Sequence, residues 1–144
     1  GANAILTSSL ILKLISGSMP ACPKIHMGYI DVRDVAKAHI YSMTEERTDG
    51  ERIIVSEKEM FFAEVGRTLN EAGFKKSPTK EMPNFLVKIM SLFVGELKGL
   101  LPALSRKGDI DKSKAKSFFD WNYISTEQSV TETAQQLQDM GLTK

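Results

Sequence analysis

The stretch GYIDVRDVAKAHIYSM, residues 28–43, gathers side chains that could do acid–base chemistry. Asp31, Asp34 and His39 lie within nine positions, together with Arg33. Carboxylates and imidazoles can transfer protons near neutral pH when burial or a neighbouring charge shifts their pKa. The stretch could therefore belong to an active site, or it could be the beginning of a helix.

The helix interpretation explains most of these residues. An aspartate at an N-cap accepts hydrogen bonds from the first free backbone N–H groups, and a second carboxylate three positions later lies near the positive helix end. The apolar residues recur at helical spacing on one face with His39: Val32, Val35, Ala36, Ile40 and Met43. We therefore predict that Asp31 and Asp34 are structural caps and that His39 is a buried polar side chain. Arg33 falls on another face, and a functional role for Asp31, Asp34 or His39 is the alternative.

Two further groups of residues could suggest chemistry, a thiol beside a histidine and a pair of histidines. Cys22 with His26 lacks an orienting third group, which a reactive thiol pair requires. The thirteen-residue spacing between His26 and His39 matches no compact metal motif, and Cys22 is the only cysteine. We expect neither a catalytic thiol nor a metal site.

Composition excludes several classes of partner. Nineteen basic and eighteen acidic residues nearly balance, so no overall field attracts nucleic acid or an anionic membrane. The basic patch near the end of the chain is interpreted as a solvated helix face: Arg106, Lys107, Lys112, Lys114 and Lys116. The apolar run from Phe85 contains Lys88 and is shorter than the roughly 20 residues of a membrane span. A single cysteine and no recognisable secretory signal favour a cytoplasmic protein.

The elements that must position these residues alternate between helix and strand. Thr7 is a predicted cap of a helix that ends at Gly17, and Phe62 to Ala72 carries a second amphipathic pattern. HMGYI and ERIIVS, residues 26–30 and 51–56, are predicted strands that could lie side by side. A short lysine-rich helix from Asp111 and a final helix capped by Ser125 and Gln128 complete the chain. We predict one α/β domain over residues 1–144, mainly helical, with few short strands and no larger sheet.

The segment DVRDVAKAH resembles a segment of the extended short-chain dehydrogenase/reductases, the NAD-dependent epimerase/dehydratase superfamily, and is nearest to the dihydroflavonol-reductase-like branch. The order of further segments supports the resemblance: GSMPACPK, GERIIVS, FFAEVGRTLNEAG, EMPNFLVKIMSLF, AKSFFDW and LQDMGL. Together they cover nearly all of residues 8–142. The chain departs from the family at FFDWNYIS, where only Trp121 of the usual leucine-glycine-tryptophan corner is present.

The resemblance implies that this chain is the C-terminal, substrate-side portion of a Rossmann-type reductase that uses NAD or NADP. The family's glycine-rich cofactor turn, at which pyrophosphate meets a helix N-terminus, is absent from the sequence. The family's catalytic tyrosine four residues before a lysine is absent too, because positions four after the tyrosines hold Arg33, Glu45 and Glu127. We therefore expect no catalytic and no cofactor-binding residues in this chain, and no cofactor bound to it.

The place of segments in the family order also implies candidates for a substrate wall. These are Ser8, Ser9 and Leu12 in the first helix, and Phe85 and Ile89 in the apolar segment. The implied substrate of the parent enzyme is a small carbonyl or alcohol compound. A nucleotide-sugar epimerase or dehydratase and a non-enzymatic binding or dimerisation module remain as alternatives. Faces that dock on an absent partner also predict self-association of the chain.

Overall fold

The structure is a computed structural model that describes residues 2–93, 98, 99 and 101–143. Its helices are α1 (Ala2–Ile15), α2 (Val32–Thr44), α3 (Phe62–Glu71), α4 (Asn84–Phe93), α6 (Ser113–Phe118) and α7 (Thr126–Asp139), with 3-10 turns η1 (Glu46–Thr48) and η2 (Leu101–Ala103). The strands are β1 (Cys22–Pro23), β2 (His26–Tyr29), β3 (Lys58–Phe61) and β4 (Glu81–Met82). The predicted α/β class, mainly helical with few short strands, is confirmed.

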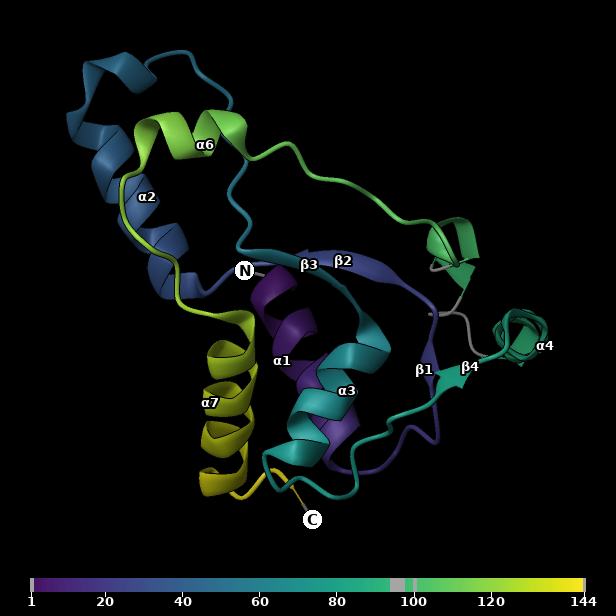
Figure 1. Ribbon diagram of the computed structural model, residues 1–144. Helices are drawn as coiled ribbons and strands as arrows, with labels where there is room; N and C mark the ends of the chain where they lie inside the picture. The colour runs from purple at the N-terminus through teal and green to yellow at the C-terminus, as the bar shows by residue number, and fades with distance from the viewer. Residues whose placement is uncertain (1, 94–97, 100, 144) are drawn as a thin grey trace.

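Two small sheets replace the pairing expected from the sequence. β2 runs antiparallel to β3, with His26 opposite Phe61 and Tyr29 opposite Lys58. β1 runs parallel to β4. The predicted strand ERIIVS is therefore wrong, because β2 pairs with the residues just after it. Residues 51–56 have no strand assignment and lead into β3 as an extended trace (Figure 1).

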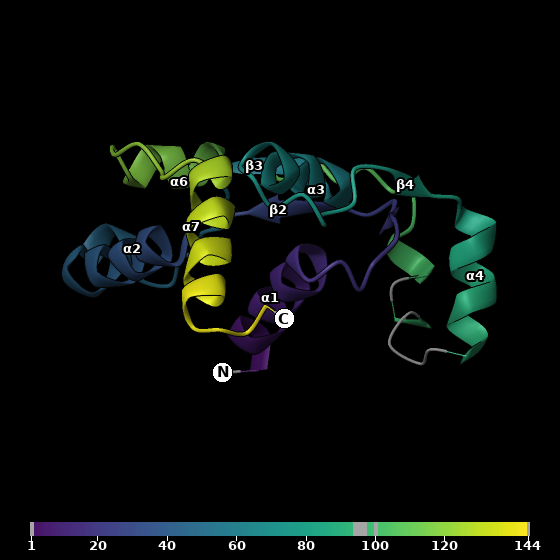
Figure 2. The same cartoon turned by 90° about the horizontal axis from the view of Figure 1, so that it is seen from below.

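The main core lies where α1, α3 and α7 pack beside the strands (Figures 1 and 2). Its buried side chains come from all three helices and from β1 and β3: Ile11, Leu14, Ile15, Cys22, Met60, Phe62, Ala63, Val65, Leu69, Val130, Ala134 and Leu137. α1 begins at Ala2, so Thr7 lies inside the helix and is not its cap, contrary to the prediction. The helix ends at Ile15, close to the predicted end at Gly17. Gly17 has a φ of 75°, which a helix cannot continue through.

A second, smaller cluster joins α2 to α6 at one end of the molecule (Figure 1). We call it the aromatic cluster; its members are Ala38, Tyr41, Ile53, Val55, Ala115, Phe118, Phe119 and Trp121. The Tyr41 and Phe119 rings meet edge to face at 5.5 Å, and Phe119 and Trp121 lie 4.7 Å apart between centroids. Such pairs stabilise a small cluster beyond the area that they bury.

The aromatic cluster determines which face of α2 is buried. Asp34 and Ala38 are the buried residues of this helix, and Tyr41 continues the same side. The face predicted to pack is instead open, because Val32, Ile40 and Met43 are 76%, 66% and 85% exposed. The helix exists as predicted, but it is rotated about its axis relative to the prediction.

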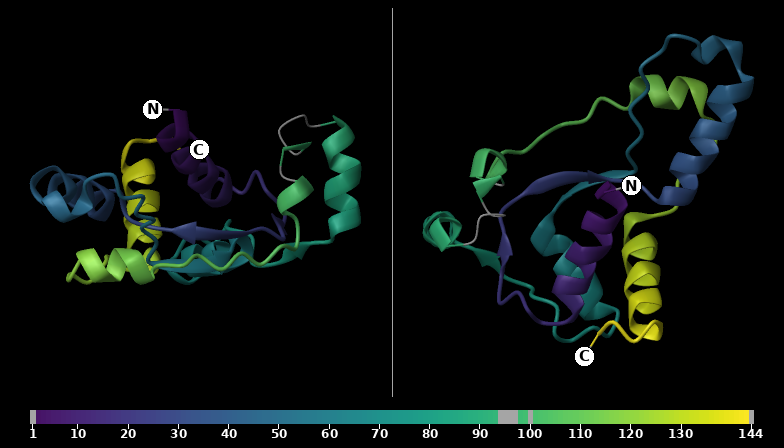
Figure 3. Two further views of the ribbon diagram at one scale, coloured as in Figure 1. Left: turned by 90° about the horizontal axis from the view of Figure 1, so that it is seen from above. Right: turned by 180° about the vertical axis from the view of Figure 1, so that it is seen from behind.

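The apolar helix α4 stands at the opposite end from α2 (Figures 1 and 3). Both α1 and α4 project from the same side of the strands, at separate places (Figure 2). No helix in the described part of the chain is long and apolar enough to span a membrane.

Candidate functional site

The candidate residues on α1 differ in exposure. Ser8 is exposed, whereas Ser9 and Leu12 are half-buried. Leu12 packs against the main core from its edge, and the neighbouring turn contributes Ile11 and Leu14 to that core. Of these three candidates on α1, only Ser8 is therefore fully open to solvent.

The candidates on α4 lie on its open face. Phe85 and Ile89 are 64% and 51% exposed, while Val87 is fully buried on the inner side. An exposed apolar face on a helix marks a surface that binds a ligand or another protein surface. Phe85 and Ile89 therefore belong to a surface that has no cover within the described residues.

A short tether fixes where α4 begins. The Asn84 side-chain amide donates to Ser105 Oγ at 2.8 Å, and the Ser105 backbone N–H donates to the Lys24 carbonyl at 2.8 Å. Ser105 has a φ of 57°, which is unusual for a residue with a side chain. The tether links the start of α4 to the chain that follows β1.

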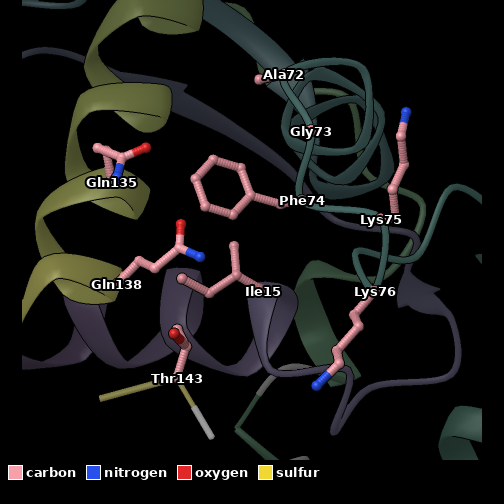
Figure 4. A pocket seen from close by; sticks show the side chains of 9 residues that line it. All are labelled: Ile15, Ala72, Gly73, Phe74, Lys75, Lys76, Gln135, Gln138 and Thr143. Atoms are coloured by element: carbon pink, nitrogen blue, oxygen red, sulfur yellow. The ribbon is translucent and has the colours of Figure 1, made fainter. Parts of the chain in front are cut away.

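The structure does not bring the two candidate sets into one hollow. One surface hollow, of about 350 Å³, lies between α3, α7 and the end of α1. Its lining includes Phe74, which points toward Gln135 and Gln138, whereas the amines of Lys75 and Lys76 point away from each other (Figure 4). No candidate residue lines it, and its side chains offer no acid–base pair.

Another hollow is a groove of about 320 Å³ beside α2. Its lining includes His39 and Met43 from α2, Ile53 and Val55 from the extended segment, and Phe119. The sequence pattern does not predict this groove, because it places His39 and Met43 on a face that packs. Helical spacing places both residues on one side of α2, but it does not say which side is covered.

Asp31 and Asp34 connect α2 to other parts of the chain. Asp31 lies at the N-cap and accepts from the Arg33 backbone N–H at 2.8 Å, while the Arg33 guanidinium binds both of its carboxylate oxygens. The hydrogen bonds from Arg33 lower the pKa of Asp31 well below its usual range. Asp34 does not cap its own helix; its carboxylate accepts from the Ile124 backbone N–H at 2.7 Å. Arg33 also binds Glu132 of α7, so these residues fix α2 against the last helix.

His39 is exposed, which corrects the prediction that it is a buried polar side chain. Its Nδ1 lies 2.8 Å from the Val35 carbonyl oxygen of the preceding turn, so this ring nitrogen is occupied within α2. The rotation of α2 toward the aromatic cluster moves His39 to the rim of the groove. No titratable partner contacts it among the described residues.

Burial disfavours the ionised form of three further reactive side chains. Burial raises the pKa of the Cys22 thiol to about 11, and its Sγ lies 3.8 Å from the Pro78 carbonyl oxygen. Burial also raises the pKa values of Tyr29 and Tyr123, which is the opposite direction from that of a tyrosine activated by a lysine. Among the described residues, no three His, Cys, Asp or Glu side chains gather as metal ligands.

Three helix N-termini in the described part of the chain do not suit the phosphates of a dinucleotide. A helix N-terminus binds phosphate through free backbone N–H groups, but acidic side chains already occupy three such ends here. Asp31 occupies the start of α2, Glu64 accepts from the Phe61 backbone N–H at α3, and Glu57 accepts from the Thr126 backbone N–H at α7. Their negative charges would repel a pyrophosphate group.

Known proteins include relatives of this chain, although no family model matches it. Over 115 residues it is 30% identical to the NADPH-dependent methylglyoxal reductase GRE2 of Saccharomyces cerevisiae, and the match covers 80% of this chain and 30% of that relative. The chain therefore spans about a third of the length of the curated relative.

Solved structures agree with this relationship. The crystal structure of yeast methylglyoxal/isovaleraldehyde reductase Gre2 complexed with NADPH superposes with a TM-score of 0.68 at 26% identity, covering 92% of this chain and 40% of that one. The crystal structure of gox2253 shares the fold with a TM-score of 0.73 at 18% identity, over 96% of this chain and 45% of that one. The homologues of this chain are thus Gre2-like NADPH-dependent reductases, as its resemblance to the extended short-chain dehydrogenase/reductases implied, and the chain matches a portion of them.

Proposed function

We propose that residues 1–144 form the substrate-side, C-terminal portion of an NADPH-dependent reductase that acts on small carbonyl compounds. The similarity to yeast methylglyoxal reductase over most of this chain carries the proposal. In this arrangement α1 and α4 contribute two walls of a cleft that the rest of the enzyme completes, because both project from the same side of the strands (Figure 2).

The chemistry in this proposal divides between the two portions. Nicotinamide supplies the hydride when it is bound in the complete enzyme. The residues of this chain would orient the carbonyl compound and exclude water through the apolar face of α4, which carries Phe85 and Ile89. Acidic side chains lie at helix N-termini, and burial raises the pKa values of Tyr29 and Tyr123. Both observations support the proposal that this chain neither holds the cofactor nor donates the proton.

A cofactor-binding measurement tests the first part of this proposal. Calorimetric titration of the 144-residue chain with NADPH should detect no binding, and NADPH should not be oxidised when methylglyoxal is added. Binding of NADPH together with turnover above the buffer rate would show that the chain is a complete reductase and would refute the division of roles.

A chimera tests the second part. We expect activity when this chain replaces the matching portion of yeast methylglyoxal reductase. In that chimera Ile89→Asp should raise KM for methylglyoxal about tenfold, because a charge disfavours an apolar wall, and should leave the affinity for NADPH unchanged. Leu142→Asp is the matched control, since Leu142 is also exposed, at 48%, but lies beyond α7. Equal effects of the two substitutions on KM would show that α4 is not part of the substrate wall.

A further inference from the structure

Residues 22–25 hold both ends of the part of the chain that contains α4. On one side β1 pairs in parallel with β4, and α4 begins two residues after β4 ends. On the other side Ile25 forms an antiparallel bridge with Leu104, where the chain returns from α4. The Ile25 carbonyl also accepts from the Phe62 backbone N–H at 2.9 Å, which fixes residues 22–25 to the start of α3. We call residues 22–25 the α4 base.

The tether between Asn84 and Ser105 joins the two ends directly. The Asn84 amide donates to Ser105 Oγ at 2.8 Å, and the Ser105 backbone N–H donates to the carbonyl of Lys24 in the α4 base. Among the described residues, no other side chain of α4 forms a hydrogen bond or an ion pair outside this helix. Asn84 is the first residue of α4, so the tether acts at the point about which the helix would turn.

Stability alone accounts poorly for the conformation of Ser105. Its φ of 57° lies in the left-handed region, which is unfavourable for a residue with a Cβ. The residue is exposed, so water competes for its hydrogen bond and the net gain in stability is small. Strained backbone is retained where local geometry matters for function. The strain at Ser105 therefore points to the placement of α4.

Small changes at the start of α4 are magnified along the helix, which stands away from the other helices (Figures 1 and 3). The helix has 10 residues and is therefore about 15 Å long. A rotation of about 10° at Asn84 would move its far end by roughly 2.6 Å. Phe85 follows Asn84 directly, and Ile89 lies one turn further along the same face. Even a shift of about 1 Å in groups that position a substrate can lower the rate strongly.

We propose that Asn84 and Ser105 are positioning residues of the reductase. They set the angle of α4 on the α4 base and thereby the places of Phe85 and Ile89 in the substrate wall. This inference rests on the proposed function, because that function assigns α4 to the wall. Both residues act through α4, and neither needs to contact the carbonyl compound.

Distances between spin labels test the geometric part in the 144-residue chain. Glu71→Cys at the exposed end of α3 and Leu92→Cys near the end of α4 carry the labels, while the buried Cys22 stays unlabelled. Ser105→Gly removes the hydroxyl and relaxes the positive φ, so it should broaden the distance distribution by about 2 to 3 Å. Ser113→Gly, at an exposed serine that begins α6, is the matched control and should leave the width unchanged. An unchanged width in Ser105→Gly overturns the proposal.

Kinetics in the chimera with yeast methylglyoxal reductase test the functional part. Ser105→Gly should raise KM for methylglyoxal about fivefold, which corresponds to the loss of one hydrogen bond of ordinary strength. The KM for NADPH should not change, and Tm should not fall, because glycine tolerates the positive φ. A merely structural role predicts a change in Tm and none in KM. Asn84→Asp should keep the original KM, because the Ser105 hydroxyl can donate to a carboxylate.

A double substitution decides whether the two residues act as one unit. Asn84→Ala and Ser105→Gly remove the same hydrogen bond, so the double variant should have about the KM of either single variant. Effects that multiply would overturn the proposal. So would an unchanged KM in Ser105→Gly when Ile89→Asp raises KM, a result that leaves the proposed function intact. If Ile89→Asp also leaves KM unchanged, α4 is not part of the wall, and the inference fails together with that assignment.

Discussion

At the scale of single residues, Gly66 in α3 lies close against another backbone segment. A Cβ added there would lie 2.1 Å from the Pro78 carbonyl oxygen and 3.5 Å from Cys22 Sγ. The nearest atom belongs to the backbone, which cannot move aside as a flexible side chain can. Glycine at this position therefore lets α3 lie directly against the chain before β4.

We predict that Gly66→Ala lowers the free energy of unfolding by about 2 kcal/mol, the usual cost of overpacking a core. Urea denaturation monitored by circular dichroism measures the change. Gly108→Ala is the control, because a Cβ at Gly108 meets nothing within 4 Å. Equal stability of the two variants would mean that α3 can shift without loss.

The second residue-scale feature is the Asp31 carboxylate, whose pKa is lowered mainly by hydrogen bonds from Arg33. A group whose pKa is lower in the folded state stabilises the fold above its unfolded pKa of about 3.9, and that stabilisation is lost as the pH falls through the folded value. Protonation of the Asp31 carboxylate should therefore lower the stability of the fold in acid.

We predict that Asp31→Asn lowers the free energy of unfolding at pH 7 by about 1 kcal/mol and makes its decline below about pH 4 shallower. Denaturation curves at a series of pH values measure both effects. Asp109→Asn, at an exposed position, is the control and should keep the wild-type profile. An unchanged acid profile in Asp31→Asn would contradict the role of the Asp31–Arg33 pair.

At the scale of elements, the sequence predicted which helices exist better than it predicted how they face. The caps are local signals: Asp31 begins α2 and Ser125 begins α7, where Ser125 accepts from the Gln128 backbone N–H. The buried side of α2 depends instead on Phe119 and Trp121, which lie about eighty residues away in the chain. Helical periodicity contains no information about such a distant neighbour.

Strand pairing shows the same limit. ERIIVS has the stronger strand composition, yet β2 pairs with Lys58–Phe61. Hydrogen-bonded partners determine a strand, and the ladder begins where the Glu57 N–H reaches the Tyr29 carbonyl. The candidate substrate wall on α1 and α4 was inferred only from the place of these segments in the family order. Nothing in the spacing of the residues could have located the groove beside α2.

The tether of α4 supports a prediction at this scale. Asn84→Ala removes the hydrogen bond to Ser105 Oγ and should increase amide exchange in α4 about fivefold to tenfold, since about 1 kcal/mol of local stability is lost. Exchange in α7 should not change. Asn122→Ala, at an exposed position next to Trp121 of the aromatic cluster, is a control. Faster exchange in both helices would show a global effect and not a local tether.

At the scale of the whole molecule, the chain consists of one well-formed core with open surfaces at both ends. The core of α1, α3 and α7 is fully internal, whereas α2 and α4 expose apolar faces at opposite ends (Figure 1). A chain that matches only a portion of its reductase homologues can thus still have a core of its own. The core maintains the fold, and the apolar side chains on α2 and α4 stay exposed.

The burial of Cys22 gives this molecule an intrinsic reporter of its own opening. Cys22 lies on β1, and its side chain is fully buried in the main core beside α3. A maleimide can therefore reach its sulfur only when that core opens. We predict that labelling of the native chain is slower than that of the urea-unfolded chain by a factor of about 10³ or more, the range expected for a stable core. Mass spectrometry would follow the modification over time. Because no second thiol competes for the reagent, the labelling rate would measure how often the interior is exposed without any engineered probe.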